Sequence, residues 1–561
     1  MYKRQDKKDV HQRQFLVGYY TTAGNVSIDE KALRRHLAEK LPKYMIPNYF
    51  MQLEHMPMTP SGKTDRKNLP KPNFTVKSEN YAAPHTKQQE ALCHLMEELL
   101  SIEKVGIDDD FFEYGGDSLS AIEYVAKAHG LGIEIALQNV FDYPTVRKLT
   151  AFLKDKNRPK VDYKASDFEK YEPLLKKNVI TPSFVPEKKP LGNVLLTGAT
   201  GFLGAHIIDS FLKDEQGKIY CLVRGGDTNS ASRRLAEKLH YYFGEKYNSE
   251  FNRRIIPVCG DIETDGLSAK LPSDIRTVIH TAASVKHYGS YAYFHKVNVE
   301  GTKNVAAFAK SVHAKLIHIS TLSVSGNSLA DDFNVYRSEE EKHFYETSLY
   351  IGQPLDNVYV HSKFEAEKCV YDAMSEGLEA KVIRVGNLTN RTGDYKFQPN
   401  YKENAFLTRL KAVLDFGMFP DYLMNLYAEF SPIDKTAQGI IKIAQYAKQQ
   451  NTFHLNSDRV IYFDRFLEIL HQMGIAMQVV DGKTFYEALQ KTMNRAGTAY
   501  IYEAVQNDLD ADGQLVYDSN IRIKNDFTVW FLKNVGFEWN ETDIKYIKGY
   551  IEYFRSIGYL H

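Results

Sequence analysis

The chain has 561 residues with 71 basic and 71 acidic side chains, so its formal net charge at pH 7 is zero. This balance removes any bulk electrostatic reason to bind nucleic acid or an anionic membrane. Apolar residues make up 43% of the sequence, as in globular domains with packed cores, and the length predicts roughly three or four such domains.

The sequence shows no sign of a membrane span, a secretory signal, a disulfide framework or a cysteine metal site. No apolar stretch approaches the ~18 residues needed to span a bilayer, and the basic N-terminus MYKRQDKKDV lacks the apolar segment of a secretory signal. The cysteines form no CxxC pair and match neither a disulfide framework nor a metal site. They are Cys93, Cys221, Cys259 and Cys369. We therefore expect a reduced, cytoplasmic protein with no metal centre.

Two stretches have the composition of linkers. Residues 69–86 are rich in Pro, Asn, Ser and Thr, and residues 154–192 are charged and contain prolines with little periodicity. They divide the chain into three segments, which we take as residues 1–75, 82–155 and 185–561.

The first segment contains the stretches LPKYMIP (41–47) and SGKTDRKNLP (61–70), after an amphipathic helix that Ser27 would cap. These stretches resemble the last two motifs of adenylation domains in nonribosomal peptide synthetases. The resemblance implies a small, partial α+β adenylation subdomain in which Lys63 matches the lysine that contacts the acyl-adenylate. A solvated lysine in a Ser-Gly turn would give the same local pattern. Because so short a segment cannot enclose both ATP and a carboxylic acid, we expect no adenylation activity.

The middle segment has the pattern of a small helical bundle. Residues 118–130 and 145–153 predict two helices, and Gly130 is placed to end the first of them. An earlier helix over residues 87–100 places a run of apolar side chains on one face. These are Ala91, Leu92, Leu95, Met96 and Leu99.

The stretch FFEYGGDSLSAI, residues 111–122, leads into the second of these helices. Asp117 or Ser118 could serve simply as its N-cap, since both residue types cap helices well. However, Gly115 and Gly116 leave the Ser118 hydroxyl accessible to another protein, and a helix N-terminus suits an attached phosphate. The stretch resembles the carrier-protein signature. The resemblance implies 4'-phosphopantetheine on Ser118, added by a phosphopantetheinyl transferase, and a thioester-bound acyl group at the end of this arm.

The long third segment alternates strands with helices. The apolar runs NVLL, KIYCLV, TVIHTAAS, KLIHIST and AKVIRVGN are separated by helix-like stretches. This alternation predicts a parallel, doubly wound α/β sheet.

A glycine turn follows the first of these strands and opens an apolar helix, with Gly198, Gly201 and Gly204 in GxxGxxG spacing. Glycines at such positions allow a tight turn and a close backbone approach to a pyrophosphate at the helix N-terminus. The predicted cofactor contacts in this turn are Thr197, Gly198, Thr200, Gly201, Phe202, Leu203 and Gly204.

The end of the strand KIYCLV bears on the choice of cofactor. An acidic residue ~20 positions after the glycine turn would bind a ribose 2'-hydroxyl, but Arg224 stands there. Arginine can pair with a 2'-phosphate, so NADPH is favoured over NADH. Arg234 is a second candidate for this phosphate, although on spacing alone a solvated helix face explains it equally well. Asp261 and Ile262 match residues that flank the adenine in similar folds.

The stretch YVHSK places Tyr359 and Lys363 one helical turn apart, hence on one face. The lysine charge, together with its hydrogen bond to the cofactor ribose, would lower the pKa of the tyrosine. Such a tyrosine can give a proton to a developing alkoxide. Thr321, at the end of another strand, supplies a second hydroxyl donor.

Together these motifs resemble the extended short-chain dehydrogenases/reductases with a Thr–Tyr–Lys triad. The resemblance implies a Rossmann-type part over about 190–400 and a mostly helical substrate and docking part over about 400–561. It also implies further cofactor contacts, with the last four bordering the nicotinamide. They are Ala282, Ala283, Asn298, Val385, Gly386, Asn387 and Leu388. Lys286 departs from the related sequences and is given no role, and His287 and His361 are interpreted as structural.

The order of segments resembles the C-terminal end of a nonribosomal peptide synthetase, and also aminoadipate and carboxylic acid reductases. It implies NADPH-dependent release of a carrier-bound acyl or peptidyl thioester as an aldehyde, or further reduced to an alcohol, with the upstream synthetase domains as partners. The alternatives are a carrier module with an inactive reductase, a non-redox cyclising release domain, and a nucleotide-sugar epimerase or dehydrogenase of the same fold. The fused carrier and the retained Tyr359 and Lys363 argue against them.

Overall fold

The computed structural model of the chain comprises two compact units, which meet in sequence near residue 162. The residues that the structure describes are 2–7, 14–22, 28, 33, 37, 47, 49–59, 64–65, 68–70, 81–100, 102, 104–116, 118–154, 163–175, 185–264, 271–285, 289–326, 329, 342–355, 357–446, 450–493, 498–505 and 521–560. Within these ranges, no helix is both long and apolar enough to cross a membrane.

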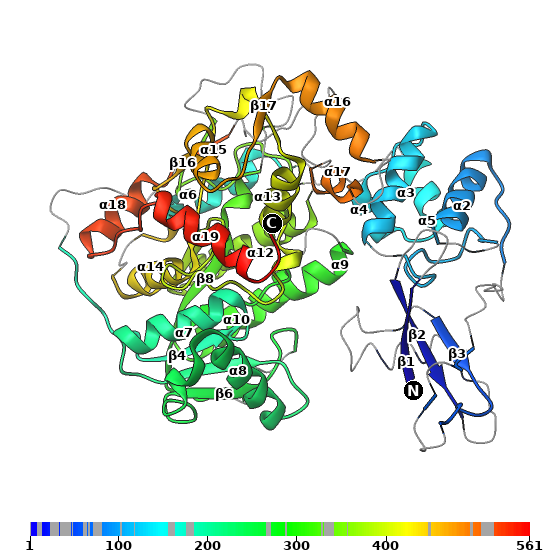
Figure 1. The fold of residues 1–561 in the computed structure, drawn as a ribbon. Helices are drawn as coiled ribbons and strands as arrows, with labels where there is room; N and C mark the ends of the chain where they lie inside the picture. Colours follow the sequence, from blue (N-terminus) through cyan, green and yellow to red (C-terminus); the bar gives the residue numbers. More distant parts are fainter. Residues whose placement is uncertain are drawn as a thin grey trace. The chain divides into compact units, whose positions relative to one another are not determined.

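The N-terminal unit begins with a three-stranded sheet (Figure 1). Strand β1 (Tyr2–Lys7) runs antiparallel to β2 (Gln14–Tyr20), and β3 (Tyr49–Gln52) lies parallel to β2 on its other side. Val17, Tyr19 and Leu69 form its small core, and the Tyr19 hydroxyl donates to the Pro70 carbonyl at 2.6 Å. The predicted Ser27 cap and Lys63 lie outside the described residues.

The same unit contains the predicted helical bundle. Helices α2 (Lys87–Leu100) and α3 (Ser118–Gly130) have the bounds that the sequence predicts, and α5 (Val146–Lys154) is shifted by one residue at each end. The Tyr124 hydroxyl of α3 donates to the Leu92 carbonyl of α2 at 3.1 Å. A further short helix, α4 (Leu137–Asp142), was not predicted, because six residues are too few to show a helical period.

The C-terminal unit is built on a seven-stranded, all-parallel sheet. Its strands are β4 (Asn193–Thr197), β5 (Ile219–Val223), β6 (Ile255–Cys259), β7 (Ile275–His280), β8 (Lys315–Thr321), β10 (Ala380–Val385) and β15 (Thr452–Leu455). Their spatial order is β15-β10-β8-β7-β4-β5-β6. From β4 the next strands are added on one side of the sheet, and from β7 they are added on the other, so the order of strand addition reverses between β4 and β7. In open α/β sheets, ligands bind outside the carboxyl ends of the strands at such a point.

Helices cover both faces of this sheet, as the sequence analysis expects of a doubly wound fold. Helices α7 (Phe202–Asp214), α8 (Thr228–Phe243), α14 (Ile433–Tyr446) and α18 (Asp526–Asn534) contribute to the core on one face. Helices α10 (Gly301–Ser311), α12 (Val358–Ser375) and α6 (Glu172–Leu175) contribute to the core on the other. Successive strand residues alternate between the two cores: Val194 and Leu196 belong to the first, and Leu195 to the second.

A mostly helical region follows β10. It contains α13 (Ala405–Phe416), α15 (Phe463–Gln472), α16 (Gly482–Met493), α17 (Ala499–Val505) and α19 (Ile544–Ser556). Small strand pairs connect these helices, including β13 (Tyr427–Ala428) with β16 (Ile461–Tyr462). The elements α14, β15 and α18 also follow residue 400 but pack into the sheet layers, so the later part of the chain serves both regions.

Several histidines of the C-terminal unit are buried without charge. Burial lowers the pKa of His206 to about 4 and that of His280 to about 3. Burial also lowers the pKa of His318, whose ring nitrogens find no hydrogen-bond partner among the described residues. Since the unfolded chain takes up these protons near the ordinary pKa of 6.5 and the folded chain does not, acid weakens folding. Each such histidine costs about 1.4 kcal/mol per pH unit below 6.5.

We therefore predict that replacing His318 by Leu lowers the acid sensitivity of the fold. His318→Leu removes a desolvated ring without losing a hydrogen bond, so stability at pH 7.5 should be unchanged or higher. The decline of unfolding free energy between pH 6.5 and 5 should become shallower by about 1.4 kcal/mol per pH unit. Urea denaturation followed by tryptophan fluorescence measures this, because Trp530 and Trp539, the chain's two tryptophans, both lie in this unit.

The control is His240→Gln, since His240 is exposed at the end of α8 and should leave the slope as in the wild type. An unchanged slope in His318→Leu would contradict the assignment of His318 as a buried neutral ring.

Candidate active site

The glycine turn lies at the carboxyl end of β4, where the strand order reverses. Gly198 has φ +73°, and a Cβ there would lie 2.4 Å from the Thr281 hydroxyl oxygen. A Cβ on Gly204 would lie 2.2 Å from the Gly198 carbonyl oxygen. Gly201 is the N-cap of α7 and supplies no side-chain acceptor to the first-turn N–H groups. The turn therefore requires glycine, and it leaves a backbone cradle at a helix N-terminus that suits a phosphate.

Thr197 was expected to contact the cofactor, but its side chain has another use. It is fully buried, and its hydroxyl pairs with His280 Nδ1 at 2.7 Å and accepts from the Ala282 N–H at 3.3 Å. The Thr197 carbonyl accepts from the Thr281 hydroxyl at 2.8 Å. Thr197 thus ties the end of β4 to the segment that follows β7. Its side chain is not available to a ligand, because these partners occupy it.

The predicted phosphate partners lie at the end of β5. Arg224 is largely exposed, and its guanidinium lies 3.9 Å from the Glu263 carboxylate. Arg234, on α8, donates from Nη1 to the Arg224 carbonyl, which places its side chain beside the Arg224 backbone. The Asp261 carboxylate accepts from the Glu263 N–H at 3.1 Å. Ile262 is buried and belongs to the core, so little of its side chain is exposed for a contact with an adenine.

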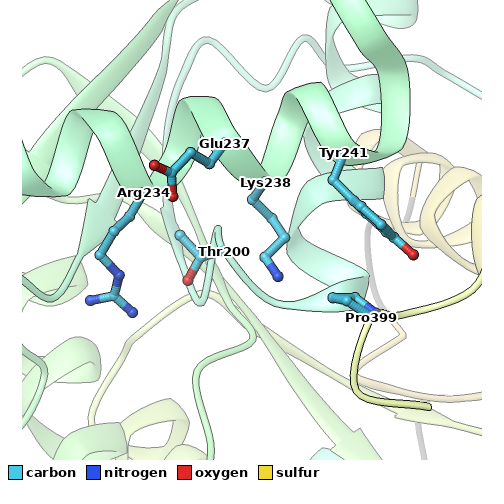
Figure 2. Close-up of a pocket in the computed structure, with 6 residues that line it drawn as sticks. All are labelled: Thr200, Arg234, Glu237, Lys238, Tyr241 and Pro399. Carbon is cyan, nitrogen blue, oxygen red and sulfur yellow. The ribbon is translucent and has the colours of Figure 1, made fainter. Parts of the chain in front are cut away.

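A pocket of about 380 Å³ lies beside the glycine turn (Figure 2). Its lining residues are Thr200, Arg234, Glu237, Lys238, Tyr241 and Pro399. Of these, the sequence analysis identified only Thr200 and Arg234. The signal was present, since positions 234, 237, 238 and 241 share one helical face, but nothing in the sequence shows which face of α8 turns toward the glycine turn.

The predicted catalytic residues meet at the ends of α12 and β8. The Asn357 side chain caps α12 by accepting from the N–H groups of Tyr359 at 3.0 Å and Val360 at 3.2 Å. The cap places Tyr359 in the first turn, where its side chain hydrogen-bonds that of Thr321. Lys363 is 4% exposed, and its Nζ donates to the Ile319 carbonyl at 2.7 Å. The structure therefore brings Thr321, Tyr359 and Lys363 together.

The expected effect of Lys363 on Tyr359 does not appear in the chain itself. Burial raises the pKa of Tyr359, and the hydrogen bond with Thr321 lowers it only in part. Burial also lowers the pKa of Lys363, from 10.5 to about 8. The expected lowering involves a hydrogen bond from Lys363 to the cofactor ribose, and in the chain alone desolvation dominates the protonation of both groups. At neutral pH the tyrosine is protonated and the lysine is mostly cationic.

Asn298 was also expected to contact the cofactor, and it too is buried. Its Oδ1 accepts from the Ser284 N–H at 2.7 Å, and its Nδ2 donates to the Ser284 carbonyl at 3.1 Å and to the Ser362 hydroxyl at 2.9 Å. The Ser362 hydroxyl donates in turn to the Tyr359 carbonyl at 2.9 Å. The Asn298 amide is thus satisfied within the protein and ties the segment after β7 to the first turn of α12.

A continuous polar chain joins the strand before the glycine turn to the backbone of Tyr359. The Thr302 hydroxyl donates to the Asn298 carbonyl at 2.5 Å and so accepts from His280 Nε2 at 3.1 Å. His280 is thereby protonated on Nε2, and its Nδ1 accepts from the Thr197 hydroxyl at 2.7 Å. The sequence of contacts is Thr197, His280, Thr302, Asn298, Ser362 and Tyr359.

The segment after β10 is held by a carboxylate that the sequence analysis missed. Glu429 accepts from the Asn387 N–H at 2.9 Å and from the Ser457 N–H at 3.3 Å. A Cβ on Gly386 would lie 2.9 Å from a Glu429 oxygen. Val385 pairs with Thr321 across β10 and β8, so Gly386, Asn387 and Leu388 follow the sheet edge beside the catalytic hydroxyls. No sequence signal links Glu429 to this loop, because 42 residues separate it from Asn387.

The other predicted positions vary in how far the structure describes them. Ser118 is the first residue of α3, whereas Asp117, Lys286 and His287 lie outside the described residues. Gly115 has φ +94°, and a Cβ on Gly116 would lie 2.3 Å from the Phe111 ring. The two glycines were interpreted as giving access to Ser118. Turn geometry and packing on Phe111 require them independently.

Ala282 and Ala283 follow β7 and are half-buried at the switch point between β4 and β7. Phe202 and Leu203 form the first turn of α7. The His361 ring nitrogen Nε2 pairs with the Tyr163 hydroxyl at 3.2 Å, which agrees with a structural role for this histidine.

Two known protein families match the two units in turn. The family described as "Phosphopantetheine attachment site" matches residues 90–153, which include Ser118. The family described as "Male sterility protein", an NAD-binding family, matches residues 196–440. The second match includes the glycine turn and the Thr321, Tyr359 and Lys363 group.

The relatives of known function are large synthetases. A linear gramicidin synthase from Brevibacillus parabrevis is 29% identical over 563 residues, covering 97% of this chain and 11% of that protein. Tyrocidine synthase 1 of the same organism is 37% identical over 154 residues, covering 27% of this chain and 14% of that protein. The chain therefore spans well under a fifth of the length of these relatives.

Among solved structures, a thiolation-reductase di-domain from an archaeal non-ribosomal peptide synthetase has a TM-score of 0.75 and 34% identity. The match covers 86% of this chain and 100% of that chain. The carrier and reductase regions thus occur in the same order as in an experimentally known pair.

The position of Ser362 between Asn298 and Tyr359 predicts a kinetic effect. Ser362→Ala leaves an Asn298 donor without its partner, at a cost of about 1–3 kcal/mol. We expect lower kcat for thioester reduction with little change in KM for the nicotinamide cofactor, because the cradle at Gly198 is untouched. Steady-state kinetics with thermal melting separates this effect from unfolding.

Ser375→Ala is the matched control, since this serine donates to the Tyr371 carbonyl at the far end of the same helix. Equal loss of kcat in both variants would contradict a positioning role for Ser362.

The lowered pKa of Lys363 predicts a basic limb in the pH profile. The group is cationic below its pKa of about 8 and loses its proton as pH rises through that value. Single-turnover oxidation of the cofactor should therefore slow above about pH 8, while Tyr359 stays protonated. In Lys363→Arg the limb should vanish, because a guanidinium keeps its charge. A wild-type rate that stays flat or rises between pH 7 and 9.5 would contradict this.

Proposed function

The chain belongs to the thiolation–reductase proteins of non-ribosomal peptide synthetases, and on this basis we propose that it releases a carrier-bound acyl or peptidyl thioester by NADPH-dependent reduction to an aldehyde. The observation that carries the proposal is the contact between the Thr321 and Tyr359 side chains, with Lys363 buried one turn away. Two hydroxyl groups at the carboxyl edge of the sheet suit a carbonyl oxygen that gains negative charge.

The residues at the switch point fit a dinucleotide cofactor. A Cβ at Gly198 or Gly204 would fill the cradle, and the glycine N-cap of α7 leaves the first-turn N–H groups for a phosphate. When bound there, NADPH supplies a hydride. Arg224 and Arg234 at the end of β5 favour the 2'-phosphate, and no carboxylate occupies the position after β5 that would hold a 2'-hydroxyl.

The protein groups have separate tasks in this reaction. Tyr359 is protonated at neutral pH and donates to the thioester oxygen as it becomes an alkoxide. Thr321 donates to the Tyr359 hydroxyl in the chain alone, and its one hydroxyl proton would turn to the same oxygen when the substrate binds. Lys363, cationic below about pH 8, stabilises the nearby negative charge and orients the cofactor ribose. Cleavage of the C–S bond then leaves an aldehyde and the free thiol of the arm. A second reduction to the alcohol uses the same groups.

The N-terminal unit supplies the substrate in this proposal. Ser118, at the start of α3, would carry 4'-phosphopantetheine added by a phosphopantetheinyl transferase, and upstream synthetase domains would load the arm. Residues 1–75 would be the end of an adenylation domain, with Lys63 as its adenylate-contacting lysine. This segment alone is not expected to activate acids.

The test loads the chain with a transferase and a panel of acyl-coenzyme A compounds, then adds NADPH. The wild type should gain the arm's mass, oxidise NADPH and release an aldehyde that a hydroxylamine probe traps. Ser118→Ala should gain no mass and show no turnover. Tyr359→Phe should load normally and bind NADPH but lose about 100- to 10,000-fold in rate, as when a general acid is removed.

Loading of the wild type without NADPH oxidation for any acyl group would argue for a carrier module with an inactive reductase. Undiminished turnover in Tyr359→Phe would refute the assigned acid.

A further inference from the structure

The pocket beside the glycine turn contains two cationic side chains. Arg234 and Lys238 lie one helical turn apart on α8, and the Thr200 side chain faces them from the glycine turn (Figure 2). Tyr241 and Pro399 close the far end of the pocket. A hydroxyl and two cations around a space of about 380 Å³ form a chemical environment suited to an anion.

Lys238 is the half-buried cation of this pocket. Among the described residues it makes no hydrogen bond and no ion pair. It is half-buried, and its pKa is lowered by burial first and by the charge of Arg234 second. Holding two cations side by side in a partly desolvated pocket is unfavourable for the protein alone. An anion placed between the two cations would offset this unfavourable electrostatic energy.

The arginines are already partly engaged. Arg224 faces the Glu263 carboxylate at 3.9 Å, and Arg234 donates one N–H to the Arg224 carbonyl. That bond fixes Arg234 at the end of β5, where the adenosine ribose of a dinucleotide lies in this kind of sheet. A phosphate monoester at this ribose therefore lies within the reach of the Arg234 and Lys238 side chains.

We propose that Lys238 pairs with Arg234 to bind the 2'-phosphate of NADPH and is the residue that sets the preference for NADPH over NADH. This inference rests on the proposed function for the identity of the cofactor. A monoester phosphate carries close to two negative charges near neutral pH, and the pair supplies two positive ones. Arg224 then contributes less to phosphate binding, because Glu263 offsets its charge.

Glu237 also lines the pocket and acts against anion binding. Its side chain is exposed, so it can turn into water when an anion binds. Removing its charge should tighten phosphate binding, opposite to the effect of removing the charge of Lys238.

The experiment measures dissociation constants of the full chain for adenosine 2',5'-bisphosphate, NADPH and NADH by calorimetry and by cofactor fluorescence. Lys238→Met keeps the length of the side chain and removes its charge. It should weaken the bisphosphate and NADPH by about 10-fold, as expected for loss of a charge-assisted contact, while NADH binding stays the same. Lys238→Arg should restore most of the affinity, and Glu237→Gln should strengthen bisphosphate binding.

Arg233→Met is the matched control, because Arg233 is the exposed neighbour on α8 that does not line the pocket. It should bind all three compounds as the wild type does. Equal weakening of NADPH and NADH by Lys238→Met would place Lys238 on the pyrophosphate and overturn the proposal, as would unchanged binding of the bisphosphate.

These measurements involve no thioester. A chain that binds the bisphosphate through Lys238 but reduces no thioester would refute the proposed reaction and leave this inference standing.

Discussion

The site depends on the hydrogen bonds that join the end of β4 to the segment after β7. Thr197 ties the glycine turn to His280 at 2.7 Å, and the same buried chain continues through Asn298 to the backbone of Tyr359. A parallel sheet brings these strand ends together, but only satisfied polar contacts hold a cofactor cradle and an acid at a defined separation. Thr197 and Asn298 therefore position the residues that act, and their side chains are used up in doing so.

Burial determines the protonation states at this edge of the sheet. It keeps Tyr359 protonated and makes Lys363 lose its proton at about pH 8. The same effect lowers the pKa of half-buried Lys238 in the pocket on α8, where the charge of Arg234 lowers it further. In both places burial disfavours the charged form of a lysine.

Residues after position 400 also contribute to the site. Glu429 holds the Asn387 backbone at 2.9 Å, and β15 extends the sheet beside β10. The helical region after residue 400 therefore cannot be treated as an appendage, since it carries a carboxylate on which the loop beside the catalytic hydroxyls is fixed. In the N-terminal unit, Gly116 allows the Phe111 ring to pack against the backbone just before the helix that Ser118 begins.

Local patterns in the sequence were sufficient for the parallel sheet, the helices at 87–100 and 118–130, the glycine turn and the pairing of Tyr359 with Lys363, because each of these follows from periodicity or from short spacing. The grouping of Thr321 with them was implied by the resemblance to the extended short-chain dehydrogenases/reductases. The hydrogen-bond partners of Thr197 and Asn298, the raised pKa of Tyr359 in the chain alone, the contacts of Glu429 and the place of Lys238 in the pocket were decided only by the tertiary structure. Each depends on which groups become buried together and on which helix face turns inward. Desolvation and long-range hydrogen bonds arise between residues far apart in the chain, and no local pattern records them.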